Sequence, residues 1–99
     1  MIVAFSIAPA GPDDTGSYAA AVAEAVRIVR ASGLPHETNA MFTNVEGEWD
    51  EVMDVVKRAT LAVAAHSSRV SLVLKADLRE GHTDAIHAKV EAVERHLRG

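Results

Sequence analysis

The densest group of side chains that could do chemistry lies between residues 39 and 49. This segment, Asn39-Ala40-Met41-Phe42-Thr43-Asn44-Val45-Glu46-Gly47-Glu48-Trp49, combines amides, a hydroxyl, carboxylates and two aromatic rings. A carboxylate such as Glu46 can accept a hydrogen bond from an N–H group or from the exocyclic amine of a heterocycle. Phe42 could stack on a ring or plug a contact between subunits. Glu46 could equally cap the helix that follows, so the residues alone leave both roles open.

Thr43 and Glu46 lie three residues apart. On a regular strand that spacing places them on opposite faces, so they converge only if the backbone bends before Gly47. The sequence therefore predicts a shared ligand cleft only under that condition.

Other kinds of site find little support. The absence of cysteine removes disulfides, thiol catalysis and thiolate metal ligands. None of the five histidines has a second histidine four residues away, so we expect no metal. The patterns GxSxG, GxGxxG and GKS/GKT are also missing. We predict no catalytic residue and no cofactor.

Composition narrows the class of protein further. The chain has 99 residues, 48% of them hydrophobic, and a net charge of −4. This length predicts a single domain over residues 1–99. An acidic balance argues against a nucleic-acid partner. No apolar run is long enough to span a membrane and no secretory signal is evident, so we expect a cytoplasmic protein without a membrane partner.

Hydrophobic periodicity alternates along the chain. It predicts a strand over residues 2–8, a loop over 10–16, a helix over 17–32 that ends at Gly33, and either two short strands or one bent strand over 36–45. A helix over 48–65, a strand over 69–77 and a helix over 83–97 follow. The order β-α-β-β-α-β-α predicts an α+β fold: a ferredoxin-like βαββαβ sandwich with an antiparallel sheet and an additional C-terminal helix.

Each predicted helix carries its apolar residues on one face, and we expect this stripe to be buried in the helix over 48–65. The stripes are Val22, Val26 and Val29; Trp49, Val52, Val56, Ala59 and Val63; and Ile86, Val90, Val93 and Leu97. The sheet should turn Val3, Phe5 and Ile7 to the helices, which leaves small or semi-polar groups on the other face: Ala4, Ser6, Ser71 and Val73. Stacking on a second copy would cover that face, and solvation is the alternative.

Several segments occur together in an informative order. They are Ser6-Ile7-Ala8-Pro9, Ser32-Gly33-Leu34-Pro35, the run from Thr43 to Met53, Arg69-Val70-Ser71 and Lys75-Ala76-Asp77-Leu78-Arg79. Over nearly the whole chain the sequence resembles the small thiamine-binding protein family. The run T-x-x-E-G-E-W is the most specific part of this resemblance.

The resemblance implies non-catalytic binding of thiamine or its hydroxymethylpyrimidine half, as a carrier, buffer or sensor. It implies a ferredoxin-like fold, dimers formed by stacked sheets and their pairing into tetramers. Ser6, Thr43 and Glu46 become ligand candidates. Phe42 stands where the family leads us to expect a small residue, and it joins them as a pocket residue.

An enzyme of another class is the alternative hypothesis. In a small dimeric ferredoxin-like oxygenase or isomerase, His36 or Glu46 would act as the base beside Trp49 in a cleft between subunits.

Overall fold

The computed structural model describes residues 1–10, 18–79 and 85–99. Four strands form one antiparallel sheet in the order β2-β3-β1-β4: β1 (Ile2–Pro9), β2 (His36–Thr38), β3 (Thr43–Glu46) and β4 (Val70–Asp77). The helices are α1 (Ala19–Ala31), α2 (Trp49–Ala64) and α3 (Ala85–Arg98). The predicted α+β ferredoxin-like order with an additional C-terminal helix is confirmed. None of these three helices is long and apolar enough to cross a membrane.

The segment over residues 36–45 forms two strands joined by a turn, which decides between the two sequence predictions. Gly33 has a φ of 77°, a left-handed conformation that suits the residue after a helix. Apart from Ala10, the predicted loop over 10–16 lies outside the described residues, as do the predicted helix starts at residues 17 and 83.

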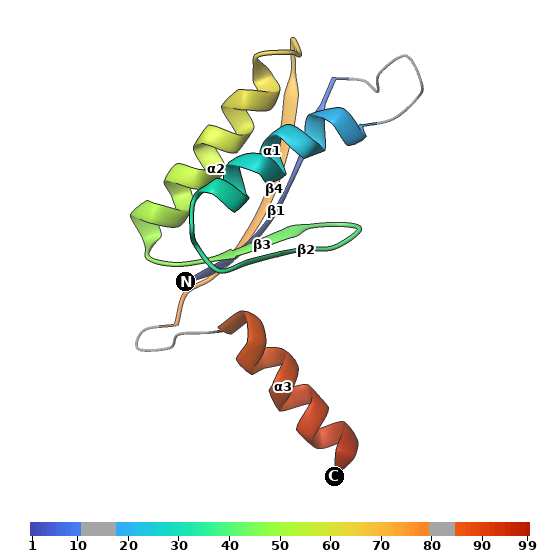
Figure 1. Ribbon diagram of the computed structural model, residues 1–99, viewed down its shortest axis with the longest axis vertical. Helices are drawn as coiled ribbons and strands as arrows, with labels where there is room; N and C mark the ends of the chain where they lie inside the picture. Colours follow the sequence, from blue (N-terminus) through green and yellow to red (C-terminus); the bar gives the residue numbers. More distant parts are fainter. Residues whose placement is uncertain (11–17, 80–84) are drawn as a thin grey trace.

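Helices α1 and α2 cover one face of the sheet (Figure 1). The core between these layers consists mainly of valine, with Phe5 as its aromatic residue. Alternation along β1 places Val3, Phe5 and Ile7 in this core, as predicted. The remaining buried members come from α1, α2 and β3: Ala25, Val29, Val45, Val52, Val55, Val56, Ala59 and Val63.

Two members of the apolar stripes on α1 and α2 are exposed, and for Trp49 the prediction of burial is wrong. Trp49 is 53% exposed, because it is the first residue of α2 and helical side chains lean toward the N-terminus, beyond the end of the helix. Val22 is 41% exposed because it lies in the wall of a cavity.

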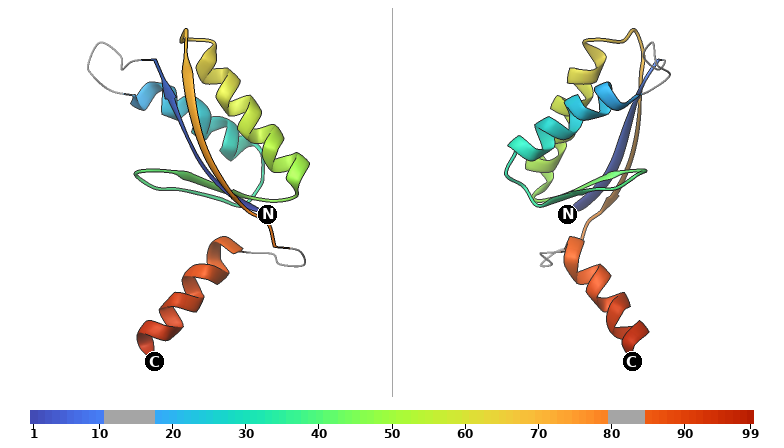
Figure 2. Two further views of the ribbon diagram at one scale, coloured as in Figure 1. Left: turned by 180° about the vertical axis from the view of Figure 1, so that it is seen from behind. Right: turned by 45° about the vertical axis from the view of Figure 1, so that its right-hand side comes forward.

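Helix α3 extends away from the two-layer body, as Figure 2 shows from two further directions. Of its predicted stripe only Ile86 is buried, whereas Val90, Val93 and Leu97 are 58%, 58% and 75% exposed. Most of this stripe is therefore uncovered within one chain, because no other described element packs against it.

Candidate functional site

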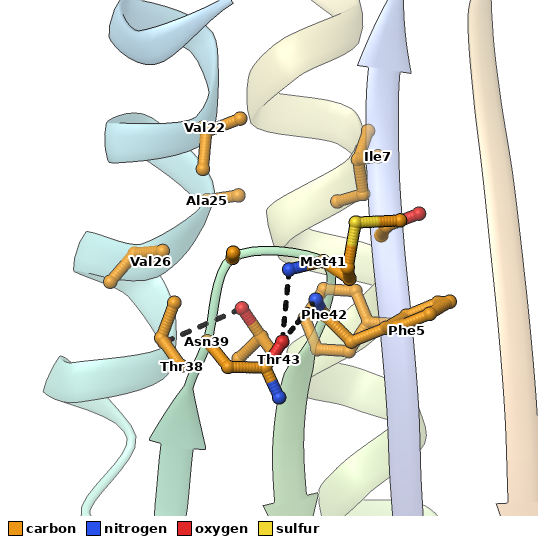
Figure 3. A pocket seen from close by; sticks show the side chains of 12 residues that line it. Phe5, Ile7, Val22, Ala25, Val26, Thr38, Asn39, Met41, Phe42 and Thr43 are labelled. Carbon is orange, nitrogen blue, oxygen red and sulfur yellow. Dashed lines mark hydrogen bonds between the residues drawn. The ribbon is translucent and has the colours of Figure 1, made fainter.

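A cavity of about 100 Å³ opens between α1, β1 and the turn that joins β2 to β3. Its apolar walls come from Val22, Ala25 and Val26 on α1 and from Phe5 and Ile7 on β1. The turn and the strand ends beside it supply the polar lining, and Figure 3 shows how these side chains surround the space. Apolar walls with a few polar groups at one end are typical of a small-molecule site.

Asn39 organises the turn. Its side-chain Oδ1 accepts hydrogen bonds from the backbone N–H groups of Met41 and Phe42, each at 2.9 Å (Figure 3). The Asn39 N–H in turn donates to the carbonyl oxygen of Phe42 at 2.9 Å. Three bonds to one residue fix the backbone that presents Phe42 to the cavity.

Thr43 supplies a nearly buried hydroxyl to the cavity. Its residue is 8% exposed, and Thr43 Oγ1 lies 3.5 Å from Oγ1 of Thr38, the residue opposite it on β2. A hydroxyl can donate one hydrogen bond and accept two, so this weak contact leaves Thr43 able to bond a ligand.

Ser6 lines the same cavity in another way. Strand alternation turns its side chain to the face opposite Phe5 and Ile7. Pairing of β1 with β3 ends at Phe5 and Thr43, whereas pairing with β4 continues to Pro9. From Ser6 onward, the edge of β1 that β3 no longer covers therefore faces the cavity. Along this edge the backbone N–H and C=O groups of β1 are open to a ligand.

Glu46 lies elsewhere. Strand β3 keeps its register through Glu46, so the backbone does not bend and Thr43 and Glu46 point to opposite faces of the sheet. Glu46 is 6% exposed, and its Oε1 accepts a hydrogen bond from the backbone N–H of Ile86 at 3.3 Å. The structure thus brings Ser6, Phe42 and Thr43 together and places Glu46 apart from them.

The sequence raised the possibility that Glu46 caps the helix after it, but the N-cap of α2 is Glu48. The Glu48 N–H donates to Glu51 Oε1 at 3.2 Å, so the first turn of α2 stabilises itself. Glu46 instead holds the start of α3 and lies on the sheet face that α1 and α2 leave uncovered, which we call the open face.

The residues of the alternative enzyme hypothesis do not meet at the cavity, which neither His36 nor Trp49 lines. His36 lies exposed on the edge strand β2, and its Nδ1 donates to the carbonyl oxygen of Leu34 at 2.9 Å. Among the side chains that the structure describes, no group of three or more His, Asp or Glu residues is placed to hold a metal ion.

Sequence reasoning missed Thr38, and it included Asn39 in the chemical segment without naming it as a site residue. For Asn39 a local signal exists, since asparagine readily bonds to backbone N–H groups two or three residues on and so initiates a turn. For Thr38 no local signal exists, because its place beside Thr43 depends on the register of the hairpin.

Comparisons with known proteins agree with this architecture. A UPF0045 protein of Mycobacterium bovis is 53% identical over 98 residues, which cover 98% of this chain and 94% of the relative. A UPF0045 protein of Synechocystis is 32% identical over 96 residues, or 95% of this chain and 77% of the relative.

Solved structures show the same fold. A hypothetical protein of Methanocaldococcus jannaschii superposes with a TM-score of 0.84 at 32% identity, over 94% of each chain. A Thermotoga maritima protein, provisionally assigned to thiamine biosynthesis or salvage, superposes with a TM-score of 0.75 at 25% identity, over 91% of this chain and 96% of that one. A family model described as thiamine-binding protein matches residues 3–94. The chain therefore belongs to the thiamine-binding protein family.

Proposed function

We propose that this protein binds thiamine, or its hydroxymethylpyrimidine half, without converting it, in the cavity that Phe42 and Thr43 line. Family membership supports the class of ligand. The observation that carries the location is the nearly buried Thr43 hydroxyl at the polar end of an otherwise apolar cavity. A carrier, buffer or sensor of thiamine needs such a site and no reactive group.

The chemistry of an aminopyrimidine fits these walls. The ring carries an amine that donates hydrogen bonds and ring nitrogens that accept them. Thr43 Oγ1 and the edge of β1 at Ser6 offer both kinds of partner, and the ring of Phe42 offers an aromatic surface. An engineered cavity of about 150 Å³ holds benzene. The present cavity, about 100 Å³ and open to solvent, accommodates the inner part of one ring and leaves the thiazolium half outside.

We also propose that the protein acts as a homo-oligomer, with the open faces of two sheets stacked and the dimers paired into tetramers. Val73 on that face is 54% exposed, and Glu46 and Asp77, which hold α3, belong to the same face. The exposed Val90, Val93 and Leu97 belong to α3, whose first turns these two carboxylates hold at this face, and a second copy would cover both the face and the helix.

Calorimetric titration with thiamine and with hydroxymethylpyrimidine tests the ligand. We expect saturable binding, and Thr43→Val should weaken it about tenfold through loss of one hydrogen bond. Thr43→Ser keeps the hydroxyl and should bind more tightly than Thr43→Val.

Thr60→Val is the matched control, because the Thr60 hydroxyl donates only to Val56 O within α2, at 2.7 Å. Absence of any saturable signal for both ligands at millimolar concentration would contradict the proposed function. Equal losses in Thr43→Val and Thr60→Val would contradict the proposed location.

A further inference from the structure

The open face of the sheet carries a second hollow, which the proposed thiamine site does not use. Ala4 on β1 pairs with Asn44 on β3 and with Lys75 on β4. Directly paired residues of neighbouring antiparallel strands point to the same face, so these three side chains form a row across the sheet. Ala4 in the middle has only a methyl group, and the row is therefore hollow at its centre.

This hollow is part of a cavity of about 150 Å³ that Ile2, Ala4, Asn44, Lys75, Asp77 and Lys89 line. Ile2 belongs to the next row, between Glu46 and Asp77. Both of those carboxylates bind α3, Glu46 through the Ile86 N–H and Asp77 through the Lys89 ammonium. The floor of the cavity is thus apolar, and α3 forms its wall on one side.

The charged side chains that line the cavity are Lys75, Lys89 and Asp77, so the lining carries one net positive charge. Asp77 forms its ion pair with Lys89, and the Lys75 ammonium acts on Asp77 only from a greater distance. Within residues 1–10, 18–79 and 85–99, neither the Lys75 ammonium nor the Asn44 side-chain amide has a hydrogen bond or an ion pair. Two donors on opposite sides of Ala4 are therefore available to one acceptor.

We propose that this cavity binds a small organic anion, a single carboxylate on an apolar body of about one ring. One carboxylate oxygen accepts from the Lys75 ammonium and the other from the Asn44 amide, and the apolar body lies on Ile2 and Ala4. The size agrees, since a cavity of about 150 Å³ holds a benzene molecule. A carboxylate is the acceptor because hydrogen bonds between two charged partners are the strong ones.

This site is distinct from the proposed thiamine site. The two cavities lie on opposite faces of the sheet, and thiamine carries a positive charge that the Lys75 ammonium repels. If two sheets stack, the cavity lies at the seam between the copies. Stacking would then exclude water from the Lys75 ammonium, and the attraction between this ammonium and a bound anion would be stronger than on a solvated surface.

Titration with benzoate, monitored by ligand-observed NMR, tests the proposal, and benzamide serves as the neutral analogue of the same shape. We expect saturable benzoate binding, at least about tenfold tighter than that of benzamide, since a hydrogen bond to a charged group is worth more than a neutral one. Lys75→Met should abolish this preference. Lys57→Met, at an exposed position on α2, should leave it unchanged.

A second variant covers the case in which Lys75→Met alters the fold. Asn44→Asp keeps the size of the side chain and adds a negative charge, so it should weaken benzoate binding and leave benzamide binding unchanged. Equal binding of benzoate and benzamide by the natural protein would overturn the proposal, and so would equal losses in Lys57→Met and Lys75→Met. Thiamine affinity should be the same in Lys75→Met as in the natural protein, so failure of one site is separable from failure of the other.

Discussion

The carboxylate of Glu46 and the backbone N–H of Ile86 join the end of β3 to the start of α3. Glu46 Oε1 lies 3.3 Å from Ile86 N, and both residues are nearly buried at 6% exposure. The first N–H groups of a helix have no partner within the helix, and the N-terminus of a helix attracts negative charge. Glu46 therefore serves as a cap supplied from a distant part of the chain.

Removal of this cap should loosen α3. Glu46→Ala should lower the free energy of opening of α3 by about 1 kcal/mol, the usual value of a lost N-terminal cap. Glu46→Gln keeps an acceptor oxygen and should cost less. Hydrogen exchange of the backbone amides in α3 measures the effect, with the amides of α2 as the internal control. Unchanged protection of α3 in Glu46→Ala would refute the capping role.

Thiamine affinity should distinguish the roles of Thr43 and Glu46, the two residues that the sequence analysis named as ligand candidates. Thr43 lines the cavity and Glu46 lies on the opposite face, so Thr43→Val should weaken thiamine binding and Glu46→Gln should not. Calorimetry of both variants under the same conditions decides the question. A loss confined to Glu46→Gln would move the ligand to the open face and beside α3.

The attachment of α3 should also depend on pH. The hydrogen bond and the positive charge of Lys89 lower the pKa of Asp77 below its ordinary value of 3.8, and the charges of Lys75 and Arg79 act in the same direction. A carboxylate with a lowered folded-state pKa stabilises the fold above its unfolded pKa. That contribution disappears as the pH falls through the folded-state value.

The matched variant is Asp77→Asn, which removes the charge at every pH. Its α3 amides should exchange faster than those of the natural protein near neutral pH. The difference should begin to shrink only as the pH approaches the ordinary value of 3.8, and it should vanish once the pH lies below the lowered folded-state pKa of Asp77. A difference that persists unchanged in acid would show that the carboxylate charge is not what holds Lys89.

Local periodicity predicted the parts of the fold that depend on local sequence. The alternation of Val3, Phe5 and Ile7 and the spacing of Val52, Val56, Ala59 and Val63 gave the correct buried faces. Trp49 failed because periodicity treats every turn of a helix alike, although the side chain of the first residue extends beyond the helix.

The candidate site was less predictable because its walls come from three distant parts of the chain. The spacing of Thr43 and Glu46 correctly indicated opposite faces on a straight strand, and that geometry separates them in the structure. Nothing local to residues 39–49 indicates that Val22 and Val26 on α1 line the same cavity as Phe42. The exposed stripe of α3 shows the same limit, because a stripe does not reveal whether its cover belongs to the same chain.

If two copies associate through their open faces, a single charged side chain placed on that face should separate them. Val73 lies on that face at 54% exposure, and Val73→Asp should convert the oligomer to monomers because a carboxylate buried between two sheets loses its hydration. Light scattering measures the molar mass. Leu61→Asp is the control, since Leu61 on α2 is similarly exposed at 57% but lies on the other side of the molecule. A natural protein that scatters as a monomer would refute the stacked-sheet assembly.

Substitutions of Gly33 should destabilise the fold because of the backbone conformation at this position, and not because a side chain lacks room. Its φ of 77° lies in the left-handed region, yet a Cβ added there would meet no atom within 4 Å. Gly33→Ala should therefore lower the free energy of unfolding by about 1 kcal/mol, the cost of left-handed geometry for an L-residue. Gly33→Asn should cost less, because asparagine tolerates this conformation. Urea denaturation of both variants provides the measurement. Equal losses in the two would mean that side-chain size, and not backbone strain, limits this position.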